Sequence, residues 1–139
     1  MNPDDAAKLI QQKLFDAPGI VDEELISACE GLIGIDPVGK RVNFKVSGLT
    51  DKERIVLYAL GMRLLSYAIK DPECAEVGRQ QLAEELRMKP NLVAAYASKL
   101  INIPPKPLRN SRRGQYEVWL PVMKAYIGEI KARIVNQGK

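Results

Sequence analysis

The stretch that decides the fold is residues 82–100, LAEELRMKPNLVAAYASKL, which predicts two short helices joined by a tight turn. Pro90 marks the start of the second helix, because its fixed φ suits the first helical position and its missing N–H would have no intrahelical partner there. Ala83 is small enough to let two crossing helices approach closely. The apolar positions recur at helical spacing and are Leu82, Ala83, Leu86, Val93, Tyr96, Ala97 and Leu100.

A predicted β-hairpin with a basic tip follows the helix pair. The proline-containing connector 103–107 leads into a first strand, and the loop 110–114 leads into a second strand over residues 115–120. Asn, Ser and Gly tolerate turn geometry, whereas Tyr, Val and Trp favour strands. The arginines of this hairpin are Arg109, Arg112 and Arg113.

In this order, a helix, a helix pair and a basic hairpin resemble the winged helix-turn-helix superfamily of DNA-binding domains, over roughly residues 50–135. The resemblance implies an α+β fold that is mainly helical, with a small β-hairpin and an N-terminal helical extension. Two parts are expected: residues 1–48 as a helix and strand extension packed on the main domain, and residues 49–139 as the winged-helix domain with its C-terminal helix.

Start and stop signals predict the remaining N-terminal elements. Helices are expected over residues 2–15 and 22–33, and the alternation of polar and apolar residues over 41–46 predicts a half-exposed strand. Thr50 and Glu53 match a capping box at the start of a long helix, which runs to about residue 69. Apolar residues spread widely around that helix, so we expect it to be the buried spine of the fold.

The last helix opens at Leu120-Pro121 and carries one apolar stripe. Two interpretations remain open: the stripe packs on its own domain, or it forms a homodimer, as terminal helices often do in winged-helix regulators. The residues of the stripe are Val122, Tyr126, Ile127, Ile130 and Ile134.

Charge divides the chain into an acidic and a basic half. Residues 79–139 hold 12 Lys and Arg against 4 Asp and Glu, a net charge of +8, whereas residues 1–78 hold 9 against 13, a net charge of −4. Clustered positive charge releases counterions from a phosphate backbone on binding, so double-stranded DNA is expected to dock on the basic half. The acidic half is the expected surface for a protein partner.

Composition argues against most enzymatic chemistry. The chain contains no histidine, which removes the commonest general base and the His-containing zinc sites. Cys29 and Cys74 have no partner cysteine at metal-binding spacing and are expected to be buried thiols. We therefore expect no catalytic residues, no metal and no cofactor. The acidic start and the short apolar runs predict no signal peptide, no membrane contact and a cytoplasmic location.

If the resemblance holds, the second helix of the pair lies in the major groove and the hairpin arginines hold a minor groove or phosphates. Asn91 would then read adenine, but no arginine on this helix supplies a bidentate guanine contact, which implies modest sequence specificity. The expected function is a transcriptional regulator or chromosome-associated protein, and the alternative is a winged-helix module for protein assembly. The expected DNA-contacting residues are Arg79, Gln80, Gln81, Lys89, Asn91, Ala95, Ser98, Lys99, Arg109, Arg112 and Arg113.

Overall fold

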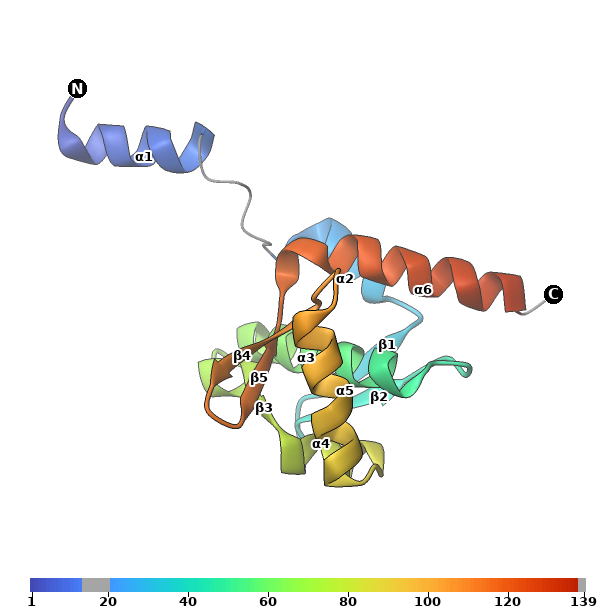
Figure 1. Cartoon of the computed structure of the whole chain (residues 1–139). Coiled ribbons are helices and arrows are strands. Elements are labelled where there is room, and N and C mark those ends of the chain that lie inside the picture. The colour runs from blue at the N-terminus through green and yellow to red at the C-terminus, as the bar shows by residue number, and fades with distance from the viewer. Residues whose placement is uncertain (14–20, 138–139) are drawn as a thin grey trace.

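The computed structural model describes residues 1–13 and 21–137 and has a mixed α+β fold, in which helices surround two small antiparallel sheets (Figure 1). In chain order its elements are α1 (Pro3–Lys13), α2 (Glu23–Cys29), β1 (Ile33–Asp36), β2 (Arg41–Phe44), α3 (Asp51–Ala68), the short 3-10 helix η1 (Pro72–Ala75), β3 (Val77–Gly78), α4 (Arg79–Leu86), α5 (Pro90–Asn102), β4 (Leu108–Arg112), β5 (Gln115–Val118), the 3-10 helix η2 (Leu120–Val122) and α6 (Met123–Gln137).

Helix α3 is the buried spine that the sequence predicts. Its capping box is formed, because the Thr50 N–H donates to Glu53 Oε1 over 2.8 Å and the Glu53 N–H donates to Thr50 Oγ1 over 3.2 Å. Every residue from Ile55 to Met62 is buried. With apolar residues buried on all sides, α3 can support elements from both halves of the chain.

Two hairpins flank the spine. Strands β1 and β2 pair antiparallel, with Ile33 opposite Phe44, and a Cβ built at Gly61 of α3 would lie only 2.5 Å from Val42. Only glycine permits this close approach of β2 to the helix. The second sheet has the order β3-β5-β4, so the two-residue strand β3 pairs with the outer side of the β4–β5 hairpin through Val77 opposite Tyr116.

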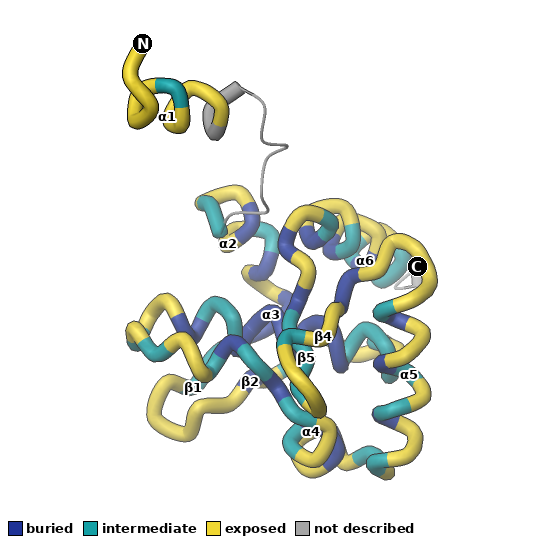
Figure 2. The backbone as a smooth tube through the Cα atoms, turned by 60° about the vertical axis from the view of Figure 1, so that its left-hand side comes forward, coloured by how far each residue is buried: buried dark blue, intermediate teal, exposed yellow. Residues whose placement is uncertain are grey.

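One continuous apolar core joins these elements. Leu25, Leu32 and Val42 contribute to it from α2, the turn that follows and β2, while Ile127 and Ile130 contribute from α6. From α2 onward, the residues before α3 thus pack into the same core as the later elements. Helix α1, by contrast, is mostly exposed (Figure 2), and its exposed residues include Leu9 and Ile10.

Several predicted boundaries are wrong. The helix expected over 22–33 ends at Cys29, because Glu30 leaves the helical region and Gly31 adopts a φ of +81°, which frees Ile33 to pair in β1. The hairpin loop expected over 110–114 is also too long, since β4 continues to Arg112 and leaves only residues 113–114 at the tip. The strand expected over 41–46 is present as β2 but ends at Phe44, and the last residues of the helix expected over 2–15 lie outside the described residues.

Candidate nucleic-acid interface

The predicted helix pair is formed by α4 and α5. The turn begins at Arg87, which takes a left-handed conformation with φ 55°, and the Met88 N–H donates to the Ala83 carbonyl oxygen over 2.9 Å. Lys89 is then the N-cap of α5 and Pro90 its first residue, as the sequence predicts. Both helices turn their apolar positions inward, and the buried residues are Leu82, Ala83, Leu86, Val93, Ala97 and Leu100.

The outward face of α5 is exposed but carries few charges. Its exposed residues include the expected contacts Asn91, Ala95, Ser98 and Lys99, with Lys89 just before the helix. Leu92 adds an apolar side chain that is 38% exposed. The Asn102 side chain donates a hydrogen bond to the carbonyl oxygen of Ser98 over 2.8 Å. This amide is therefore already hydrogen-bonded within α5.

The three expected DNA contacts at the start of α4, residues 79–81, differ in their exposure to solvent. Arg79 and Gln80 are exposed, and Gln80 donates to Glu84 Oε1 over 3.3 Å. Gln81 is half-buried and uses both polar atoms inside the fold: its Oε1 accepts from the Gly78 N–H over 3.4 Å and its Nε2 donates to the Tyr58 hydroxyl over 3.2 Å. Burial raises the pKa of Tyr58, against the opposing effect of the Gln81 bond, so this hydroxyl stays protonated at neutral pH. Gln81 therefore fixes the start of α4 against α3.

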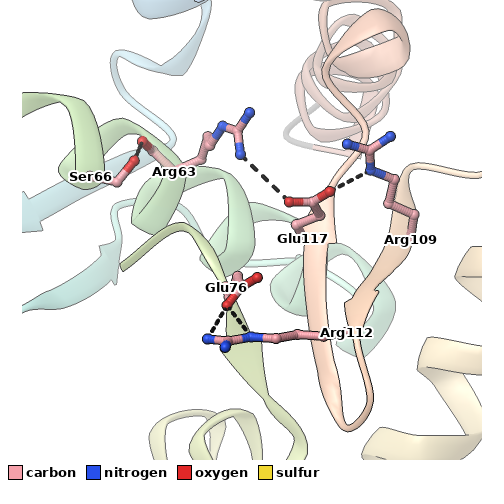
Figure 3. A network of polar contacts seen from close by, with 6 residues as sticks. All are labelled: Arg63, Ser66, Glu76, Arg109, Arg112 and Glu117. Carbon is pink, nitrogen blue, oxygen red and sulfur yellow. Dashed lines mark hydrogen bonds and ion pairs between the residues drawn. The ribbon is translucent and has the colours of Figure 1, made fainter. Parts of the chain in front are cut away.

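The hairpin arginines differ in their partners (Figure 3). Arg112 forms an ion pair with Glu76, in which Nε and Nη2 of Arg112 lie 2.8 Å and 2.6 Å from Glu76 Oε2. Arg109 pairs with Glu117 over 2.5 Å, and its guanidinium carbon lies 4.5 Å from the centroid of the Trp119 ring. These carboxylates neutralise much of the charge that the sequence assigns to the hairpin.

Arg113 occupies the hairpin tip and is exposed, and it makes no ion pair with any residue in the described ranges. It lines an open hollow of about 580 Å³ together with Arg79 and Gln80 from the start of α4, and the other lining residues are Gly78, Gly114, Gln115 and Tyr116. Two guanidinium groups and the unpaired backbone N–H groups of a helix start are the donors that bind phosphate groups. This hollow brings together three of the residues that the sequence singles out.

Sequence reasoning missed Glu76 and Glu117. Glu76 lies 36 residues from Arg112 in the chain, and the strand pairing of β3 with β5 brings them together. Glu117 stands directly opposite Arg109 in the β4–β5 register, so a correct hairpin register would have revealed this second pair.

Other chemistry is sparse in the residues that the structure describes. They include no group of three His, Cys, Asp or Glu side chains able to hold a metal ion, and no helix long and apolar enough to cross a bilayer. Cys29 and Cys74 are free thiols, and desolvation raises the pKa of each, which disfavours the reactive thiolate.

The chain matches no protein-family model, no curated protein and no solved structure.

Proposed function

We propose that this chain is a winged-helix protein that binds double-stranded DNA, as a transcriptional regulator or chromosome-associated protein of modest sequence specificity acting in the cytoplasm. The order α3, β3, α4, α5, β4, β5 and the sheet order β3-β5-β4 support the winged-helix assignment. The observation that carries the DNA proposal is the hollow lined by Arg79 at the start of α4 and Arg113 at the hairpin tip.

In this arrangement α5 enters the major groove and the hollow receives a phosphate group of the backbone. Asn91, Ala95 and Ser98 meet base edges, while Lys89 and Lys99 lie near phosphates. Only Asn91 offers a bidentate contact, so specificity is modest. Gln81 acts indirectly by holding the start of α4, and the chain acts as a binding protein rather than an enzyme.

Duplex DNA of arbitrary sequence should bind with a strong salt dependence. Each phosphate neutralised contributes about −0.9 to the slope of log affinity against log salt concentration, so the phosphate in the hollow and those near Lys89 and Lys99 together predict a slope of about −3. Fluorescence anisotropy of a labelled duplex across a salt series measures this slope. Absence of binding at low salt would reject the DNA proposal.

Arg113→Ala should weaken duplex binding to a similar extent for all sequences and lower the magnitude of the salt slope by about 1, because no carboxylate among the described residues pairs with this side chain. Arg112→Ala should have the smaller effect, since Glu76 already neutralises its charge. Lys8→Ala on α1 is the control for net charge. If Arg113→Ala bound like the parent, the hairpin tip would not contact DNA.

A protein-interaction module is the second candidate function. Leu92 and Ala95 expose apolar surface where a strongly sequence-specific reader would carry polar side chains, and two of the three hairpin arginines are neutralised. The acidic half of the chain would then face the partner protein. The salt series separates the candidates, because this one predicts no affinity for arbitrary duplex DNA.

A further inference from the structure

A second hollow lies between the last turns of α3 and the short helix η1. It has a volume of about 400 Å³ and is lined by Arg63, Ser66, Tyr67, Lys70, Pro72 and Ala75. Sites for small organic ligands in proteins span roughly 300–1,000 Å³. The hollow is therefore large enough for a compact ligand, and none of its residues belongs to the proposed DNA interface.

Arg63 has unused hydrogen-bonding capacity. Its Nη1 lies 3.6 Å from Glu117 Oε2, too far for a hydrogen bond, and its Nε is buried with no acceptor among the described residues (Figure 3). A buried N–H without an acceptor is unfavourable, so an anion that accepts a hydrogen bond from Nε would remove this cost.

Lys70 supplies a second cation. It follows α3 in a left-handed conformation with φ 55°, its side chain is exposed, and it makes no ion pair within the described residues. The nearby carboxylate of Asp71 lies 3.8 Å from Lys40 Nζ and so is partly neutralised. The hollow thus combines two cations that lie about two helical turns apart along the chain.

Tyr67 supplies a flat apolar surface. Among the aromatic side chains whose burial is described, only Tyr67 and Trp119 are exposed, and Tyr67 is 54% exposed. The Arg63 guanidinium carbon lies 5.7 Å from the centroid of the Tyr67 ring, so cation and ring are adjacent. Pro72 and Ala75 add apolar lining. Aromatic and guanidinium planes of this kind stack on nucleobases.

We propose that this hollow binds a nucleoside monophosphate, with the phosphate between Arg63 and Lys70 and the base against Tyr67. A phosphate monoester carries a charge of about −1.5 to −2 at pH 7, which matches two cations better than a single carboxylate would. The base matches the aromatic surface. The site stands independently of the proposed DNA binding, because it uses different residues.

Calorimetric titration of the full chain with AMP tests the site. Saturable binding of one AMP per chain is expected, and adenosine and ribose 5-phosphate should each bind at least about tenfold more weakly, because each lacks one of the two recognised groups. No binding at about 1 mM AMP would overturn the proposal. Equal affinity for adenosine would overturn the phosphate contact, and equal affinity for ribose 5-phosphate would overturn the stacking contact.

Substitutions at two exposed residues test whether AMP binds in the hollow. Tyr67→Ala should weaken AMP binding about tenfold by removing the stacking surface, and Lys70→Gln should weaken it by at least about threefold through loss of charge. Lys8→Gln, which makes the same charge change on α1, should leave affinity unchanged. Thermal unfolding shows whether each variant is folded. If Tyr67→Ala does not fold, the AMP affinity of Lys70→Gln alone tests the site. Unchanged affinity in Lys70→Gln, or an equal loss in Lys8→Gln, would overturn the site.

Discussion

Val93→Asp is expected to unfold the protein. Val93 of α5 is fully buried in the apolar core, so an introduced carboxylate would lose its hydration. Burying such a group costs several kcal/mol, on the order of 5 kcal/mol, which is comparable to the whole free energy of unfolding of a small domain. Circular dichroism should show loss of the cooperative thermal transition.

Ala95→Asp is the matched control, because it places the same side chain two residues along α5 on the exposed face. This variant should melt like the parent but bind duplex DNA poorly, since its carboxylate would face phosphate groups. A Val93→Asp protein as stable as the parent would show that the inward and outward faces of α5 have been assigned the wrong way round.

Removal of the residues after Gly128 is expected to abolish folding as well. Ile130 is 2% exposed in the common core, and Arg133 donates to the Gly48 carbonyl oxygen over 2.9 Å and pairs with Glu53. Loss of Ile130 alone resembles a large-to-small core substitution, which costs about 2–5 kcal/mol. Thermal unfolding of the shortened chain measures the effect, with Val135→Asp, at a position 61% exposed, as the stable control.

The same shortened chain tests the dimer interpretation of the C-terminal stripe. A helix used only for dimerisation would leave a folded monomer that binds DNA weakly, whereas the burial of Ile127 and Ile130 favours packing within one chain. A homodimer through the outer surface of α6 remains a proposal. It predicts two α5 helices about 34 Å apart and a palindromic DNA site, and sedimentation of the parent as a monomer at high concentration would exclude it.

The helix pair could be predicted because its signals are local. Helical periodicity specifies which residues face inward, and Pro90 specifies where α5 begins, since both depend on backbone geometry within a few residues. The capping box at Thr50 is local for the same reason. This periodicity also predicts which residues of α5 are exposed, namely Asn91, Ala95, Ser98 and Lys99.

The strand pair β1–β2 shows the limit of local signals. Residues around Ile33 continue the apolar spacing of α2, yet they form β1 because β2 offers a complete set of backbone partners and Gly61 makes room for Val42 beneath them. Periodicity over a short apolar run does not distinguish a helix from a buried strand. The pairing of β1 with β2 and the contact of Val42 with Gly61, 19 residues further along the chain, decided between them.

Sequence by itself determined the helix pair, the capped spine and the excess of positive charge after residue 78, since all three depend on neighbouring residues or on composition. Only the tertiary structure decided how much of that charge is free. It joins Arg112 to Glu76 and Arg109 to Glu117, and it leaves Arg79 and Arg113 together at one hollow. The physical reason is that ion pairing depends on the distance between the charged groups in space. Strand register fixes that distance, whereas composition does not.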